Sequence, residues 1–459
     1  MTIAQLARPL LKAWSSPWPP GRLSNLSAAG IILLFAWQPF RGEYRLGVAA
    51  LSLLGLALMV HGEGGRNTPL RTAALPRLAA VLACFFVPAV LSLSTSVSPG
   101  TSLEGVGSIA LSILFGTGIL AGMLDSQARQ LQQRAITIIT AAWIAAACVY
   151  GAVSVALMGN IATLSPWAAF LTSSRFGRLL TALLPVALWQ PIGRQKPLGY
   201  GLLAGAGVAT ILTGQRNNLL GYGVGACLLI SQLPRKVAIR IMAVALATTL
   251  AVYPLSPELR LRTGAIINGL TGSSQSQSQP SLLDRFNTIS SDRGYIYDAA
   301  FKMWLRNPLT GIGANAFKEA YPMFADQRDA IRFANPPAPH SIYVGMVAQT
   351  GLIGLAGLAL AIALLIRWGR AAARTPISLE AARPYAASLV VMLFPLITQD
   401  DFYDSTFSTT FIYMVCGLIS APWLGTPSAH PQTPEPAPDP GDPSIDPGPE
   451  HSEPSAHAR

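Results

Sequence analysis

The sequence has few charged residues and few cysteines, and both shortages narrow the class of protein. Only 12% of the 459 residues are charged and 51% are apolar, whereas ordinary soluble domains carry about 25% charged residues. All four cysteines lie within apolar runs: Cys84, Cys148, Cys227 and Cys416. This placement predicts small core residues rather than disulfides or metal ligands. The composition is that of a protein embedded in lipid.

About twelve apolar runs are long enough, or nearly so, to cross a hydrocarbon core ~30 Å thick. They cover residues 26–40, 44–62, 77–96, 102–124, 134–158, 176–193, 198–214, 218–234, 237–256, 341–366, 384–399 and 405–424. The predicted fold class is an all-α polytopic membrane protein of about twelve transmembrane helices, with one long loop that itself contains helices.

The runs divide the chain into five regions. Residues 1–25 contain basic residues, a tryptophan and several prolines, which is typical of a cytoplasmic or interfacial segment. Residues 26–256 hold the first nine predicted transmembrane helices, and residues 341–425 hold the last three. Between them lies the long loop, residues 257–340. Residues 426–459 are rich in Pro, Asp and Glu, so they are predicted to be a disordered cytoplasmic tail.

Lysine and arginine are distributed unevenly between the loops on the two sides. One set of loops holds Arg8, Lys12, Arg22, Arg66, Arg71, Arg77, Arg129, Arg134, Arg194, Lys196, Arg235, Lys236, Arg240, Arg367, Arg370, Arg374 and Arg383. The short loops of the other set hold only Arg41, Arg45, Arg175, Arg178 and Arg216. Because cytoplasmic loops carry the excess of basic residues, both termini are predicted to be cytoplasmic and the long loop to be outside. The net charge of +11 then needs no nucleic acid to explain it, and it is predicted to favour membrane lipids with anionic headgroups as partners on the inner face.

A helix is predicted inside the long loop, in the stretch SSDRGYIYDAAFKMWLRNPLTGIGANAF, residues 290–317. Its apolar face follows helical spacing and consists of Ile296, Ala299, Ala300, Met303 and Trp304. Ser290, Ser291 or Asp292 can cap its start. Asp298, Lys302 and Arg306 occupy a different face and are predicted to be solvated pairs. Asn307-Pro308 ends the helix, and Gly311 and Gly313 begin a turn.

Four arginines are candidate ligands of a diphosphate. Arg216 lies in the turn TGQRNNLLGYG, beside the hydrogen-bonding side chain of Gln215, and Arg175 and Arg178 open the run SSRFGRLL. Arg293 is predicted to lean toward the apolar face of the loop helix. Guanidinium groups bind phosphate oxygens in pairs. The alternative for each arginine is that it extends along the membrane surface to a lipid phosphate.

His340 is the candidate general base, because imidazole takes up a proton near neutral pH. It directly follows a proline-rich stretch and precedes a membrane-length apolar run. A capping or core histidine is the alternative. Asp400, Asp401 and Asp404 could orient a histidine or bind sugar hydroxyls, and a solvated turn is the alternative. Gln215 and Tyr297 are further supporting candidates. No convincing carboxylate pair is present to hold a divalent ion, so no metal or other cofactor is predicted.

Three motifs resemble one bacterial family. PPAPHSIYVGMVAQTGLIGL resembles the PHNxYLxxxxExGxxGL signature of the O-antigen ligase and O-antigen polymerase superfamily. DRGYIYDAAFKMWLRNPLTGIGANAF is similar to the arginine-containing helix and xxPLxGxGxxxF stretch of that family, and TGQRNNLLG to its SxSRxxxL turn. The sequence departs from the signature at Gln349, where many members carry Glu, and at Ser341, where Asn is common.

The resemblance implies a fold similar to the GT-C class of membrane glycosyltransferases. Ligases of the family move a glycan from undecaprenyl diphosphate to the lipid A–core oligosaccharide, at the periplasmic face of the Gram-negative inner membrane and without a metal. It implies that His340 is the general base and that Arg216 and Arg293 bind the diphosphate. An O-antigen polymerase, a protein O-oligosaccharyltransferase and a transporter of lipid-linked glycan are the alternatives.

Overall fold

The computed structural model describes twelve stretches of the chain: residues 22–37, 44–61, 74–158, 173–255, 260–261, 263–264, 267, 287, 293–326, 338–395, 402–403 and 405–423. Their regular secondary structure is helical, and no strand occurs in them. The chain separates into two units, residues 1–425 and 426–459. The second unit, which is the predicted tail, and most of the predicted interfacial segment lie outside the described residues.

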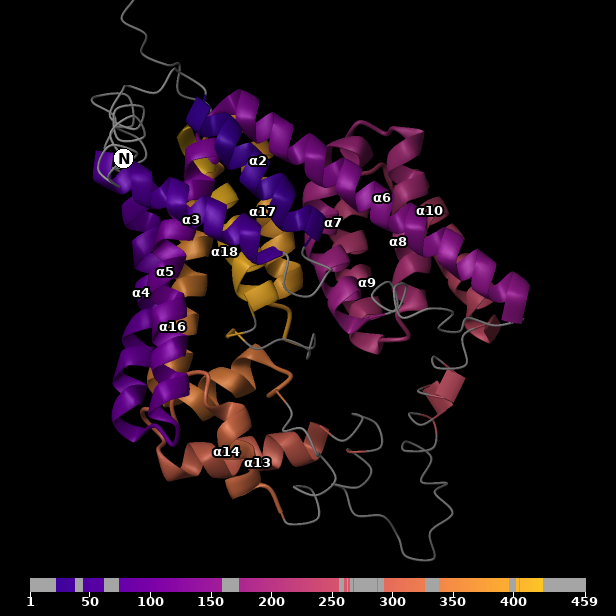
Figure 1. Ribbon diagram of the computed structural model, residues 1–459. Helices are drawn as coiled ribbons and strands as arrows, with labels where there is room; N and C mark the ends of the chain where they lie inside the picture. The colour runs from indigo at the N-terminus through magenta and orange to yellow at the C-terminus, as the bar shows by residue number, and fades with distance from the viewer. Residues whose placement is uncertain are drawn as a thin grey trace, which may run out of the picture. The chain divides into compact units, whose positions relative to one another are not determined.

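Each predicted apolar run overlaps a helix (Figure 1). These helices are α2 (Arg22–Trp37), α3 (Tyr44–His61), α4 (Leu75–Ser92), α5 (Pro99–Met123), α6 (Ser126–Met158), α7 (Ser174–Gly193), α8 (Pro197–Leu212), α9 (Arg216–Ile230), α10 (Arg235–Val252), α16 (Ile342–Ala372), α17 (Pro376–Met392) and α18 (Ser405–Ser420). The long loop contains α13 (Arg293–Arg306) and α14 (Phe317–Phe324). The second of these was not predicted.

Four helices are long and apolar enough to cross a membrane: α4 with the turn that continues it to Thr95, α5, α6 and α16. Three shorter apolar segments cover Asn25–Ala36, Arg45–Met59 and Pro197–Leu212. A helix rises 1.5 Å per residue, so one of 16 residues is about 24 Å long, which is less than the ~30 Å core. The chain is therefore a helical membrane protein, while the count of about twelve spans and the GT-C likeness stay predictions.

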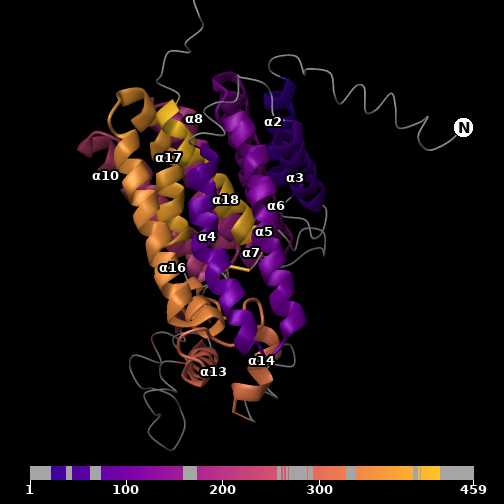
Figure 2. The ribbon, with the colours of Figure 1, turned by 90° about the vertical axis from the view of Figure 1, so that its left-hand side faces the viewer.

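Glycines allow several of the apolar helices to approach closely. A Cβ atom at Gly55 of α3 would collide with the Leu114 carbonyl of α5, and one at Gly118 of α5 would collide with the Leu51 carbonyl of α3. Between α16 and α4, a Cβ at Gly357 would meet the carbonyl of Cys84. Small residues at helix crossings are typical of membrane bundles, where close backbone packing replaces the hydrophobic effect. Figure 2 shows α4, α5 and α16 running alongside one another.

The cysteines only partly follow the prediction. Cys84 and Cys416 are buried, Cys148 is partly exposed, and Cys227 lies exposed on α9. All four are free thiols. An apolar run is enough to predict a membrane helix, but it does not tell which side chains of that helix face protein and which face lipid.

The loop helices α13 and α14 lie across the starting end of α16 (Figure 1). The predicted apolar face of α13 is confirmed for Ile296, Ala299, Ala300 and Met303, which are buried against Ala348 of α16. The predicted polar pair is also confirmed: the Lys302 amine lies 2.7 Å from Asp298. It lies 2.7 Å from Asp326 as well, which no helical spacing could predict. The predicted caps at residues 290–292 lie outside the described residues, whereas Asn287 Oδ1 accepts the Tyr295 N–H at 3.2 Å.

Candidate active site at the helix starts

Helix α16 is interrupted at Gly351, whose φ of 64° and ψ of −159° are not helical. The interruption frees backbone groups that a continuous helix would use internally. Residues 308–313 run past the interruption and form hydrogen bonds with these backbone groups. The Ile312 and Gly313 N–H groups donate to the carbonyls of Ala348 and Gln349, each at 3.0 Å. We call residues 308–313 the strap.

The strap also bonds the second part of α16. The N–H groups of Leu352 and Ile353 donate to the carbonyls of Pro308 and Leu309 at 2.9 and 3.1 Å. Two glycines permit this approach. Gly311, with φ of 68°, lies against the Gln349 backbone, and a Cβ at Gly351 would collide with the backbone of Leu309. Positive φ with no room for a side chain is a combination that glycine tolerates.

The other side of the strap is fixed by the corner between α4 and α5. Thr95 Oγ1 donates to the Gly311 carbonyl at 2.8 Å, and the Val97 N–H donates to the Ile312 carbonyl at 3.0 Å. Just after the strap, the Ala314 N–H donates to Ser92 Oγ at 3.0 Å. The strap therefore joins α13 to three apolar helices and holds the first turns of α16 in place.

His340 stands immediately before the start of α16. It is half-buried and has a φ of 53°, in the left-handed region. Few non-glycine residues adopt this conformation, although histidine is enriched among them, and it costs about 1–2 kcal/mol. Ser341 follows as the N-cap, with its Oγ accepting the Val344 N–H at 3.5 Å. Because Asn and Ser cap helices about equally well, the departure from the family signature at this position preserves the cap.

Arg175 and Arg178 lie in the first two turns of α7, and Arg216 is the first residue of α9. The two helix starts touch: a Cβ at Gly177 would collide with the side chain of Asn218. Asn218 is buried, and its Nδ2 donates to Thr213 Oγ1 at 3.1 Å across the turn that leads into α9. The predicted turn around Arg216 is thus a fixed structure.

A cavity of about 30 Å³ lies among the starts of α7, α9 and α18 and the end of α17. It is lined by Arg178, Leu179, Thr181, Ala182, Asn217, Asn218, Val391, Met392, Thr406, Phe407 and Thr410. Such a volume holds about one water molecule. The cavity is therefore too small for a sugar, and its lining shows which helix ends meet here. Arg216, Arg293 and His340 are not among its lining residues.

The start of α16 is bonded to the same end of α17. Tyr343 Oη donates to the Leu393 carbonyl at 2.5 Å, next to the cavity-lining Met392. Helix α13 joins the group through its packing on α16, in which Tyr297 and Val344 flank one apolar cluster. The starts of α7, α9, α13 and α16 therefore belong to one connected region.

Each of these four helix starts carries a basic residue: Arg175 and Arg178, Arg216, Arg293, and His340 just ahead of α16. None of the four helices has an acidic residue in its first turn. This pattern reverses the usual one, because a helix N-terminus carries about half a positive charge and favours acids. The helix dipole alone disfavours a cation at such a position by about 0.3–1 kcal/mol and favours an anion.

The remaining predicted site residues differ in their outcome. Gln215 is the N-cap residue of α9, and Tyr297 is half-buried on α13. Asp400 and Asp401 lie outside the described residues, so their supporting role stays a prediction. Gln349 is fully buried at the interruption of α16. Its side chain is a neutral amide, so position 349 cannot act as a carboxylate in this chain.

Sequence reasoning missed the strap, the cap at Asn287, and the contacts of Asn218 and Tyr343. The signal for the strap was present, since the glycines at 311 and 351 both lie in the recognised motifs. The contact of Asn218 with Gly177 has no signal in one sequence, because it joins residues of two different helices.

These features define a helical membrane protein with basic residues at the starts of α7, α9 and α13. Residues 201–359 match the family model described as O-antigen ligase. This part of the chain, from α8 to α16, therefore belongs to the O-antigen ligase superfamily, and it includes Arg216, Arg293 and His340. For this part of the chain, the match indicates an enzyme of the O-antigen ligase or polymerase type. A comparison with curated proteins gives no match.

Proposed function

We propose that the chain is an O-antigen ligase of the bacterial inner membrane. In this proposal it transfers O-antigen glycan from undecaprenyl diphosphate to a sugar hydroxyl of the lipid A–core oligosaccharide, at the periplasmic face. His340 is the general base, and Arg216 and Arg293 bind the diphosphate with help from Arg175 and Arg178. The loop carrying α13 and α14 is periplasmic, and both termini are cytoplasmic.

The observation that carries the proposal is the set of basic helix starts. A diphosphate is the group whose charge offsets both the guanidinium cations and the positive ends of the helices. Phosphate oxygens also accept paired hydrogen bonds from a guanidinium fork. Among superfamily chemistries, the family match to O-antigen ligase supports a lipid diphosphate as the donor.

The reaction needs one proton transfer and one bond exchange. The acceptor hydroxyl oxygen attacks the anomeric carbon while its proton passes to the His340 imidazole. The bond between the anomeric carbon and the diphosphate oxygen breaks, and the diphosphate leaves with the electron pair. Direct displacement from the opposite face inverts the anomeric centre. Charge on the leaving diphosphate grows during this step, and the arginines stabilise that charge in place of a metal ion.

The left-handed backbone of His340 is consistent with this role. Strained backbone persists where the surrounding structure holds it, and such residues cluster at active sites. Here the Ser341 cap, the Tyr343 bond to Leu393 and the strap all hold the first turns of α16. The imidazole would then meet its substrate with little freedom left to lose.

Reconstitution tests the proposal. The purified protein in phospholipid vesicles would be supplied with undecaprenyl-diphosphate glycan and lipid A–core, and the products separated by mass. A core oligosaccharide capped with glycan is expected, and only when both substrates are present. Longer lipid-linked chains made without the core acceptor would identify a polymerase instead. Glycan appearing on a protein acceptor would identify a protein O-oligosaccharyltransferase.

A further inference from the structure

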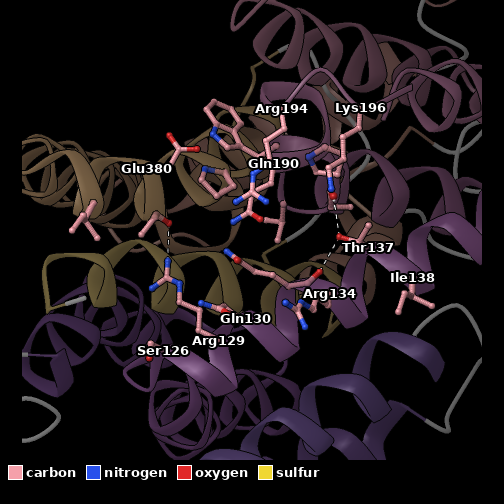
Figure 3. Close-up of a pocket in the computed structure, with 18 of the residues that line it drawn as sticks. Ser126, Arg129, Gln130, Arg134, Thr137, Ile138, Gln190, Arg194, Lys196 and Glu380 are labelled. Atoms are coloured by element: carbon pink, nitrogen blue, oxygen red, sulfur yellow. Dashed lines mark hydrogen bonds between the residues drawn. The ribbon is translucent and has the colours of Figure 1, made fainter. Parts of the chain in front are cut away.

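Figure 3 shows a wide pocket that is lined by residues of α6, α7 and α17. It has a volume of about 970 Å³ and lies between the start of α6, the end of α7 and the start of α17. A second hollow of about 530 Å³ shares Trp189, Gln190, Arg194 and Glu380 with it. The two hollows are therefore neighbours. Ligand pockets are typically about 300–1,000 Å³, so the size suits a small organic molecule or a lipid headgroup.

The lining of the pocket is strongly basic. Arg129, Arg134, Arg194 and Lys196 contribute cations, whereas Glu380 is the acid of this lining. Glu380 is itself 3.4 Å from Arg383, which lines the neighbouring hollow. The pocket and its neighbour therefore keep a clear excess of positive charge.

One of these cations, Arg129, has a structural role. Arg129 is only 3% exposed, and its guanidinium donates to Ser420 Oγ and to the carbonyls of Ala381 and Gly417, at 2.7–3.2 Å. It also lies over the ring of Tyr385 at 4.9 Å. Arg129 thus ties α6 to α17 and α18, and its charge is fixed at the wall of the pocket.

The other three cations have no such partners. The side chains of Arg134, Arg194 and Lys196 are exposed and make no hydrogen bond or ion pair with other residues in the described part of the chain. In Figure 3 their side chains come from two elements, α6 and the turn between α7 and α8. Gln130 and Gln133 add amide donors from the same side of α6.

A buried donor at the wall also lacks a partner. Trp189 lines both hollows and is 7% exposed, and its Nε1 has no hydrogen-bond acceptor among the described residues. Nearly all buried donors in proteins are paired, so an orphan beside a pocket points to an acceptor on a ligand. Phosphate and ester carbonyl oxygens are such acceptors.

Apolar side chains complete the lining. Ile138 and Ile377 line the pocket although they are 68% and 62% exposed. Val186, Pro191 and Pro384 extend this apolar surface beside the cations. A soluble phosphate would use only the cationic part, whereas a phospholipid would use both parts, with its acyl chains along the isoleucines.

We propose that this pocket is a binding site for one anionic phospholipid. Arg134, Arg194 and Lys196 hold the phosphate, Trp189 donates to a headgroup or ester oxygen, and the apolar wall receives the acyl chains. This site is separate from the proposed reaction, because it lies at the other ends of α7 and α17 from Arg178 and Met392. Its chemistry is more specific than a general attraction of basic loops to the membrane surface.

Lipid titration monitored by native mass spectrometry tests the proposal. The delipidated full-length protein would be titrated with dioleoyl phosphatidylglycerol and, separately, with dioleoyl phosphatidylcholine. The first phosphatidylglycerol is expected to bind at least about tenfold more tightly, since each cation near an anionic lipid contributes about fivefold. The triple variant Arg134→Gln/Arg194→Gln/Lys196→Gln is expected to lose this preference. Equal affinity of the wild-type protein for the two lipids would overturn the proposal.

A matched variant distinguishes lipid binding in the pocket from a general attraction of the lipid to the net positive charge of the protein. Arg367, Arg370 and Arg374 are exposed at the corresponding end of α16 and do not line the pocket. The triple variant Arg367→Gln/Arg370→Gln/Arg374→Gln changes the net charge by the same amount and should bind phosphatidylglycerol within about threefold of wild type. If both triple variants lose affinity equally, diffuse attraction to basic loops replaces the proposed site.

Two further experiments test whether the indole of Trp189 binds the ligand and whether the ligand is a lipid or a soluble phosphate. Trp189→Phe keeps the charge and most of the ring volume but removes the donor, so phosphatidylglycerol binding should weaken by about three- to tenfold. An unchanged affinity would remove the indole from the site. Inorganic phosphate or glycerol 3-phosphate should fail to displace the lipid at equal concentration. Displacement by either would mean that the pocket binds free phosphate compounds, and the lipid proposal would be wrong.

Discussion

Leu309 and Gly351 meet backbone to backbone, at the point where α16 is interrupted. The Leu309 carbonyl accepts the Ile353 N–H at 3.1 Å, so the interruption does not leave this polar group unpaired. Broken helices within membrane proteins are tolerated where neighbouring backbone satisfies the freed groups. Because the strap supplies that backbone, the two family motifs that contain these residues form one structural unit.

Replacing Gly351 by Ala should destabilise the protein severely. The left-handed φ alone disfavours alanine by about 1–2 kcal/mol, and the collision with Leu309 adds to it, so we expect a loss above about 3 kcal/mol. Thermal unfolding in detergent measures the effect. Gly107→Ala is the matched control, because a Cβ at Gly107 of α5 meets nothing within 4 Å. That change should be neutral or stabilising by up to about 1 kcal/mol, and similar melting of both variants would contradict the strap.

His340→Asn should remove the general base with less disturbance of the backbone than His340→Ala, because asparagine tolerates the left-handed region. Loss of a general base typically reduces the rate by about 10²–10⁴-fold. The expected result is therefore a folded protein with little or no capped core oligosaccharide in the reconstituted assay. Thermal unfolding of the same preparation is the control for folding. Near-normal activity of the asparagine variant would exclude His340 as the base.

Arg216→Lys and Arg293→Lys keep the positive charge but remove the guanidinium fork. If these arginines bind a diphosphate in pairs of hydrogen bonds, each change should reduce kcat/KM by about 10–100-fold, as expected for losing a charged hydrogen bond. Arg306→Lys is the matched control, since Arg306 is exposed at the far end of α13. Unchanged kcat/KM in all three variants would argue against diphosphate binding at these positions.

Lys302 gives a prediction for alkaline pH. Hydrogen bonds from Lys302 to Asp298 and Asp326 raise the pKa of its amine above the usual 10.5. A group whose pKa is higher in the folded protein than in the unfolded chain stabilises the fold. This stabilisation is fully present at pH values below the pKa of the unfolded chain, and it is lost as the pH rises through the pKa of the folded protein. The difference in melting temperature between wild type and Lys302→Met should therefore be constant between about pH 7 and pH 9 and shrink above pH 10.5. A constant difference through that range would show that the pair contributes through packing alone.

The sequence predicted the helices well, because apolar runs bounded by charges and prolines are a strong local signal. The buried face of α13 also followed from spacing alone, as Ile296 and Met303 show. Contacts between segments that are far apart in the sequence were harder to predict. The pairing of Thr95 with Gly311, or of Tyr343 with Leu393, depends on how helices assemble. Helical periodicity carries no information about such partners, and their hydroxyl groups look like ordinary polar residues in the sequence.

The arginines also show the difference between what the sequence predicts and what depends on packing. Counting basic residues predicted which loops share a side, but Arg129 was grouped with the topological cations although it is buried in the bundle. Its partners Ser420, Ala381 and Gly417 come from chain positions far from α6. A basic residue near a helix start can therefore be an exposed loop cation or a buried, hydrogen-bonded residue such as Arg129, and only the packing of the helices determines which.

The strap has a practical consequence. All of its bonds to α16 run between main-chain atoms, so these bonds do not depend on the side chain at 309, whereas Ile312 is buried in the apolar cluster beneath α13. Leu309 is 62% exposed. A cysteine introduced there could carry a spectroscopic label beside the interruption of α16 at Gly351, and a change in its signal on adding the proposed substrates would show that they act on this region.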